Sequence, residues 1–182
     1  MNICPEFHLV KINSVRALMK DNSIDLLVLG PGTHLRWLLG FSPPQDERPS
    51  MLLIGKEKEI FLIPSVNAED VRRKTDIKIN IWKDERGPDQ ALKEALLYID
   101  ESSAKHIAID EAMRAHFALI AMDALPNPTH EFTGSTIGAL RMRKDQTEFI
   151  NLKENALIDD RAMKAGFAAI KEGVTELEIG KA

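Results

Sequence analysis

The spacing of apolar residues predicts alternating helices and strands along most of the chain. Apolar positions three and four residues apart indicate a helix over residues 6–21, followed by the polar segment Asp21–Ser23. The continuous apolar run Leu26–Leu29, bounded by Asp25 and Gly30, is typical of a strand covered on both faces. Further strands are predicted at residues 51–54, 60–63, 77–82, 106–110 and 129–132, and further helices at residues 68–74, 88–100 and 112–124.

The order of these elements defines the expected fold class. The charged segment Gly55–Glu59 joins two strands as a hairpin turn, so that pair is antiparallel, whereas strands joined through helices are typically parallel. We therefore predict an α/β fold with a mixed sheet of about five or six strands flanked by helices. The small polar segment Thr133–Ser135 marks a domain boundary, with a first domain over residues 1–135 and a second segment over residues 136–182.

The second segment is dominated by one long helical pattern over residues 145–172. Asp145 with Glu148 forms a capping-box sequence at its start, and Gly173 supplies a left-handed residue after it. Its apolar residues fall on one face: Phe149, Leu152, Ala156, Met163, Phe167 and Ile170. Such a stripe requires a partner surface, and a further helix that begins at Thr175 has room for only a few residues. We therefore interpret residues 136–182 as the truncated start of another domain.

Particular residues in this segment carry a family resemblance. The long alanine-bearing helix is preceded by Arg141 and Lys144 and has Glu148 near its start. It is followed by the sequence Gly173-Val174-Thr175-Glu176. This arrangement resembles the entry to the catalytic domain of the pita-bread metallopeptidases, the group that contains prolidase, Xaa-Pro aminopeptidase and creatinase.

The upstream residues agree with that resemblance. The strand Asp25–Leu29 is followed by the stretch Thr33–Phe41, an order similar to that of the creatinase/prolidase N-terminal domain. In this stretch the family usually has an Asn and a Tyr ahead of a Leu and a Gly. This chain has Thr33 or His34 in place of the Asn, and Trp37 in place of the Tyr. The resemblance implies a ribonuclease-H-like fold for residues 1–135, without ribonuclease chemistry.

The resemblance also implies a metal-dependent hydrolase as the parent protein. In that family two divalent ions (Mn, Co or Zn), held by Asp, Asp, His, Glu and Glu, generate a hydroxide that attacks the amide bond before proline. Those ligands lie beyond the first catalytic-domain helices, so we expect neither catalytic nor metal-binding residues in this chain, and no peptidase activity from it alone. The family implies instead a role in forming a homodimer and in shaping the entrance for a small peptide substrate. Two alternatives remain open: a catalytically inactive pita-bread module that binds proteins, and the N-terminal domain of a creatinase-like amidinohydrolase.

Four residues are candidates for that substrate entrance: His34, Arg36, Trp37 and Arg48. The first three follow the strand at residues 26–29, and α/β proteins tend to bind ligands at the carboxyl ends of strands. Arg48 lies in a polar, proline-rich segment, and its guanidinium suits a peptide carboxylate. The alternative interpretations are ordinary packing for His34 and Trp37 and a solvated loop for Arg48.

Composition and charge narrow the class of protein. The 182 residues carry a formal net charge of −4, with 24 basic residues interspersed among 28 acidic ones, so we expect no nucleic-acid partner. We find no secretory signal pattern and no apolar run long enough to span a membrane, so we expect no membrane partner. Together with a single cysteine, Cys4, these features predict a cytoplasmic protein.

Overall fold

The structure, a computed structural model, describes the backbone of residues 5–181 and the side chains from His8 to Lys181. Cys4 therefore lies outside the described residues. The chain divides into a first compact unit that extends to Met142 and a second unit that begins at Arg143. The first unit continues past the segment Thr133–Ser135, because the following helix buries Ile137 completely against it.

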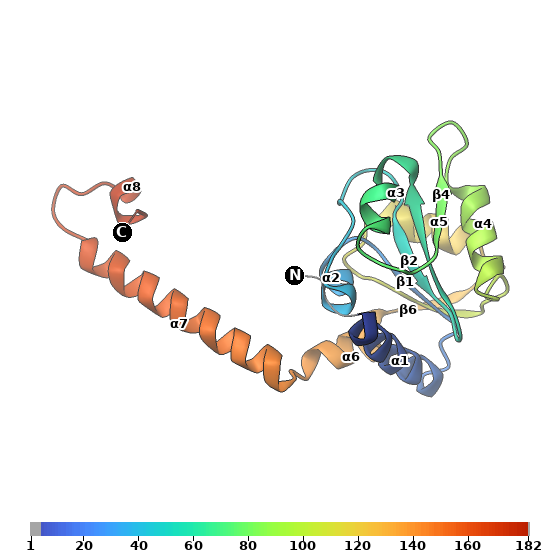
Figure 1. The fold of residues 1–182 in the computed structure, drawn as a ribbon, viewed down its shortest axis with the longest axis horizontal. Helices are drawn as coiled ribbons and strands as arrows, with labels where there is room; N and C mark the ends of the chain where they lie inside the picture. Colours follow the sequence, from blue (N-terminus) through green and yellow to red (C-terminus); the bar gives the residue numbers. More distant parts are fainter. Residues whose placement is uncertain (1–4, 182) are drawn as a thin grey trace. The chain divides into compact units, whose positions relative to one another are not determined.

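Within the described residues, the first unit is built on a mixed sheet of six strands in the order β4-β3-β2-β1-β5-β6 (Figure 1). The strands are β1 (Leu26–Leu29), β2 (Met51–Ile54), β3 (Glu59–Pro64), β4 (Ile79–Trp82), β5 (His106–Ile109) and β6 (Thr129–Phe132). β2 is antiparallel to both β1 and β3, whereas the pairs β1–β5, β5–β6 and β3–β4 are parallel. The predicted α/β class, the mixed sheet and the charged hairpin turn are confirmed.

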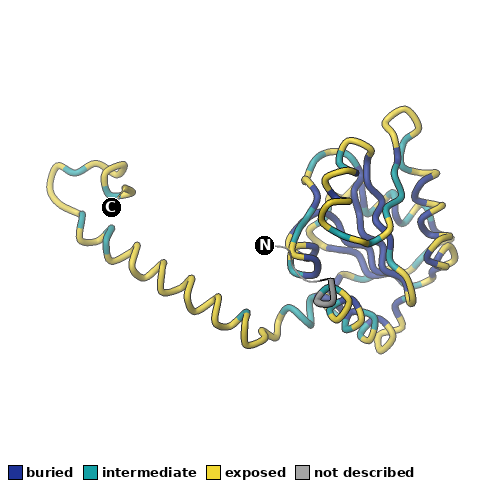
Figure 2. The backbone as a smooth tube through the Cα atoms, in the orientation of Figure 1, coloured by how far each residue is buried: buried dark blue, intermediate teal, exposed yellow. Residues whose placement is uncertain are grey.

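Helices cover both faces of this sheet. α4 (Asp89–Tyr98) and α5 (Ala115–Asp123) pack on one face. The other face is covered by α1 (Pro5–Asp21), α2 (Thr33–Leu39), α3 (Ser65–Arg72) and α6 (Ile137–Met142). The sheet is therefore the middle layer of three, and its interior strands are shielded from solvent on both sides (Figure 2).

β1 shows how the alternation of side chains divides the core. Leu26 and Val28 face the cluster formed with α4 and α5, while Leu27 and Leu29 face the cluster formed with α1, α2 and α3. All four side chains are fully buried. An uninterrupted apolar run is what a strand buried on both faces requires, and this explains why β1 was predictable.

The second unit consists of α7 (Gln146–Ala169) and the short α8 (Glu176–Ile179). The predicted capping box of Asp145 with Glu148 is present, and the predicted helix start at Thr175 is also a capping box, formed with Glu178. Gly173 has the predicted left-handed conformation, but α7 already ends at Ala169. No residue of α7 is buried, and Figure 2 shows the helix exposed along most of its length. In the part of the chain that the structure describes, no helix is both long enough and apolar enough to cross a membrane.

Candidate functional site

The segments that follow β1 and β5 lie at the same edge of the sheet, because these neighbouring strands run parallel. β1 leads through Gly30–Gly32 into α2, which carries His34. β5 leads directly into Asp110 and Glu111. This junction brings an imidazole and two carboxylates together in the first unit.

The backbone at this edge is tightly packed. A Cβ atom on Gly30 would lie 2.5 Å from Cβ of Met113, closer than two such atoms can approach, so this position requires glycine. On the neighbouring segment, Asp110 Oδ1 accepts a hydrogen bond from the Ala112 N–H at 2.9 Å. This turn explains why α5 begins at Ala115 rather than at residue 112 as predicted.

His34 is 4% exposed and lies in a chain of hydrogen bonds. Its Nδ1 lies 3.0 Å from Arg141 Nη1, and because a guanidinium can only donate, Nδ1 accepts and Nε2 carries the proton. Nε2 lies 3.2 Å from Thr133 Oγ1 and 3.3 Å from Glu111 Oε1. Thr133 Oγ1 in turn donates to Glu111 Oε2 at 2.5 Å. This series of hydrogen bonds begins at Arg141 on α6 and passes through His34 on α2. It continues through Thr133 in the 3-10 helix η1 (Thr133–Ser135) and ends at Glu111.

The two carboxylates beside His34 have pKa values that are shifted in opposite directions. Burial raises the pKa of Asp110, whose side chain is 1% exposed, and the Ala112 N–H and His34 oppose this effect only in part. Partial burial acts in the same direction on Glu111, but hydrogen bonds from Thr133, from its own backbone N–H and from His34 together outweigh it and hold its pKa below the ordinary value. Glu111 is therefore the carboxylate whose ionised form this network stabilises.

His34, Asp110 and Glu111 form the one group in the described residues close enough to share a metal ion, with candidate ligand atoms within 4.8 Å of one another. The hydrogen bonds argue against such a centre. A metal needs a free nitrogen lone pair, but Nδ1 of His34 accepts from Arg141 and Nε2 carries the proton. The guanidinium of Arg141 would also repel a cation. We therefore interpret this group, with Thr133, as a tie that joins α2, the β5–α5 loop, η1 and α6.

Arg36 and Trp37 lie on α2 with His34 but have different surroundings. The side chain of Arg36 is exposed. Trp37 is half-buried against α1, where Lys11 Nζ lies 4.1 Å from its ring centroid. The same ammonium donates a hydrogen bond to the Trp37 carbonyl oxygen at 2.8 Å and so satisfies a backbone acceptor near the end of α2.

Arg48 lies in the loop before β2 and is held by carboxylates. Its Nε and Nη2 donate to the Asp84 carboxylate at 3.1 Å each, and its Nη1 donates to Glu47 at 2.8 Å. The hydrogen bonds that Arg48 donates to Asp84 raise the pKa of Arg48 further above its already high value. These bonds tie Arg48 to the β4–α4 segment, and none of them joins it to the three candidates on α2.

The partners of His34 were not found from the sequence. Thr133 and Arg141 lie 99 and 107 residues further along the chain, and no local pattern connects them to α2. A signal did exist for Asp110, because it ends a predicted strand and strand ends are where α/β folds gather polar groups. That signal becomes specific only with the knowledge that β5 pairs with β1.

Comparison with known proteins identifies the first unit. Residues 11–143 match the family model of the creatinase/prolidase N-terminal domain. The Xaa-Pro dipeptidase of Lactobacillus delbrueckii subsp. lactis is 22% identical over an alignment of 183 positions. That alignment covers 93% of this chain and 47% of that protein. The putative dipeptidase YkvY of Bacillus subtilis is 25% identical, with the same coverage. The chain thus spans about half the length of the curated relatives it matches.

Solved structures share the fold. A dipeptidase from Pyrococcus horikoshii superposes with a TM-score of 0.81 at 26% identity, covering 93% of this chain and 47% of that one. The dipeptidase PepE of Mycobacterium ulcerans gives a TM-score of 0.85 at 20% identity, over 98% of this chain and 48% of that one. The isolated N-terminal domain of a Streptococcus pyogenes X-Pro dipeptidase gives a TM-score of 0.61 at 14% identity, over 68% of this chain and 92% of that one. Through residues 11–143, this chain belongs to the creatinase/prolidase N-terminal domain family.

Proposed function

We propose that this chain is the N-terminal part of an Xaa-Pro metallopeptidase of the prolidase or aminopeptidase P type, which hydrolyses the amide bond preceding proline. In this proposal the first unit contributes to homodimer formation and to the substrate entrance. Two divalent metal ions (Mn, Co or Zn) are held by residues further along the parent protein. The observation that carries the proposal is that the chain aligns over 93% of its length with an Xaa-Pro dipeptidase, yet covers only 47% of it.

The exposed face of α7 supports the existence of a further folded part. Phe149, Met163 and Phe167 are 56%, 58% and 65% exposed. Burying one large apolar side chain stabilises a protein by about 1.5–3 kcal/mol, so several such residues on one helix favour a covering surface. The proposed cover is the remaining half of the parent protein, whose catalytic domain α7 would open.

The His34 network has a positioning role in this proposal. Arg141 lies on α6, the last helix of the first unit, and its bond to His34 ties that helix to the edge of the sheet. Arg141 also donates to Thr33 Oγ1 at 3.2 Å. The network thereby fixes the point at which the chain leaves the first unit.

The described residues do not fit the family's two-metal site. That site uses five Asp, His and Glu ligands, whereas the described residues bring only His34, Asp110 and Glu111 within reach of one ion. The imidazole among them already uses both ring nitrogens in hydrogen bonds. We therefore assign no catalytic step to residues of this chain.

The entrance residues remain part of the proposal, with roles set by their surroundings. Arg36 is exposed and Trp37 is half-exposed, so both can contact a peptide directly. His34 is buried and would act through the position of α2. A substrate carboxylate at Arg48 would have to compete with Asp84 for the same guanidinium donors.

The test compares this chain with a longer one from the same coding sequence. Both would be assayed for hydrolysis of Xaa-Pro dipeptides with added Mn, Co or Zn. The proposal expects metal-dependent hydrolysis only from the longer chain, and no stoichiometric binding of these ions to the 182-residue chain by calorimetry. Metal-dependent hydrolysis by the short chain, or a longer chain that folds and binds metal but cleaves no such peptide, would contradict it.

A further inference from the structure

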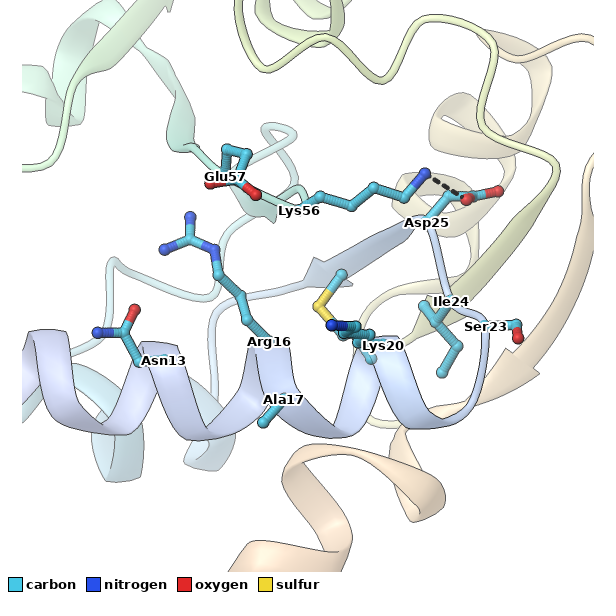
Figure 3. Close-up of a pocket in the computed structure, with 10 residues that line it drawn as sticks. Asn13, Arg16, Ala17, Lys20, Ser23, Ile24, Asp25, Lys56 and Glu57 are labelled. Carbon is cyan, nitrogen blue, oxygen red and sulfur yellow. Dashed lines mark ion pairs between the residues drawn. The ribbon is translucent and has the colours of Figure 1, made fainter.

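A pocket of about 570 Å³ opens between α1, the α1–β1 loop and the β2–β3 turn (Figure 3). It lies at the amino end of β1, whereas the His34 network lies beyond the carboxyl end of that strand. Asn13, Arg16, Ala17 and Lys20 line it from α1, and their spacing of three and four residues places them on one helix face. The volume falls within the range of about 300–1,000 Å³ that is usual for small-molecule sites.

Most of the charged groups around this pocket already have partners in the protein. Arg16 forms an ion pair with Glu59 and donates a hydrogen bond to the Gly55 carbonyl oxygen at 3.1 Å. Lys56 Nζ lies 2.6 Å from Asp25 Oδ1, the ion pair drawn as a dashed line in Figure 3. These pairs fix two walls of the pocket and leave their charges compensated.

Two other charged side chains that line the pocket, both exposed to solvent, have no such partner among the residues that the structure describes. Within the described residues, no hydrogen bond or ion pair engages the ammonium of Lys20 or the carboxylate of Glu57. Lys20 comes from α1 and Glu57 from the β2–β3 turn, on opposite sides of the pocket (Figure 3). Met19 and Ile24 also line the pocket, but they are only 1% and 2% exposed, so they form its floor and offer a ligand little apolar surface.

We propose that this pocket binds a free α-amino acid or short peptide that carries both an ammonium and a carboxylate. The ligand carboxylate pairs with Lys20, its ammonium pairs with Glu57, and its side chain occupies the remaining space of the pocket. A ligand with a single charge would leave one of the two pocket charges unpaired, so the arrangement selects a zwitterion. This site uses none of the proposed entrance residues and does not depend on the proposed peptidase activity.

The test is a titration of the whole 182-residue chain, followed by amide nitrogen and proton chemical shifts. L-leucine and L-leucyl-L-leucine are the zwitterionic ligands, and the tighter of the two identifies the source as amino acid or peptide. N-acetyl-L-leucine and L-leucinamide each keep only one of the two charges. We expect saturable shift changes at Ser23, Ile24 and Glu57 with the zwitterions, and binding of each capped compound weakened about tenfold.

Matched variants test the two proposed ligand contacts, at Lys20 and at Glu57, separately. Lys20→Gln and Glu57→Gln should each weaken binding of the zwitterion about tenfold. Lys20→Gln should leave L-leucinamide unaffected, and Glu57→Gln should leave N-acetyl-L-leucine unaffected, because each compound lacks the group that the altered residue pairs with. Lys83→Gln and Glu85→Gln, exposed residues outside the pocket, are the controls. Absence of saturation, equal binding of capped compounds, or equal effects of the control variants would overturn the proposal.

Discussion

Replacing Thr133 by Val tests the hydrogen-bond network around His34. The substitution keeps the shape of a fully buried side chain but removes the hydroxyl that donates to Glu111 and accepts from His34. A hydrogen bond to a charged group contributes about 1.5–3 kcal/mol to stability. Because the Glu111 side chain is 48% exposed, water replaces part of that bond, so the lower part of the range applies. We expect Thr133→Val to lower the free energy of unfolding by about 2 kcal/mol at pH 7.

The pH dependence of this loss identifies its cause. The pKa of Glu111 is lowered in the folded state, so its contribution is present above its unfolded value of about 4.5 and is lost as pH falls through the folded value. The stability difference between Thr133→Val and the unaltered chain should therefore shrink as pH falls below about 4.5. Urea unfolding followed by tryptophan fluorescence measures the first unit specifically, because Trp37 and Trp82 both lie in it.

Thr136→Val is the matched control. Thr136 is equally buried, but its hydroxyl donates to the backbone oxygen of Thr133 rather than to a carboxylate. Its loss should cost about 1 kcal/mol at every pH. An equally pH-independent loss for Thr133→Val, or no loss at all, would refute the reasoning about Glu111.

Three further predictions concern other parts of the chain. The Ser50 hydroxyl is buried and has no hydrogen-bond partner among the described residues, so Ser50→Ala should leave stability unchanged or raise it by up to about 1 kcal/mol, and a clear drop in the urea midpoint would contradict this. Burial acts to raise the pKa of Asp25, but hydrogen bonds from Lys56 and two backbone N–H groups hold it below 3.8. Asp25→Asn should therefore cost about 1–2 kcal/mol at pH 7, a loss that disappears as pH falls through the folded pKa; a pH-independent loss would count against the assignment. The isolated chain should self-associate through α7, and Phe149→Glu with Phe167→Glu should return it to monomer in light scattering; a monomeric unaltered chain would exclude this.

The parts of the fold that were predictable are those that local pattern determines. β2 and β6 have the predicted bounds, since each is a short run between clear turn signals. The capping boxes at Asp145 and Thr175 were equally local, because their partners lie three residues away. Helix bounds were less predictable where a side chain intervened, as at Asp110, whose turn delays α5.

The candidate site was predictable only in part, for a physical reason. His34 could be placed at a strand end from sequence, but its environment is set by residues about a hundred positions away that the sheet order brings close. The same holds for Arg48, whose partner Asp84 is 36 residues distant. Spacing along the chain carries no information about such long-range pairs. The burial of His34 and the pairing of Arg48 with Asp84 could therefore be seen only in the structure.

The most direct measurement is the intact mass of the natural protein, isolated from its own cells, together with the coding frame past Ala182. We predict a mass about twice the 20.4 kDa of this chain, as the coverage of its relatives indicates, and a downstream sequence that supplies the Asp, Asp, His, Glu and Glu metal ligands. A natural protein of 20.4 kDa, or a longer one without those ligands, would contradict the proposed peptidase and direct the search towards binding partners.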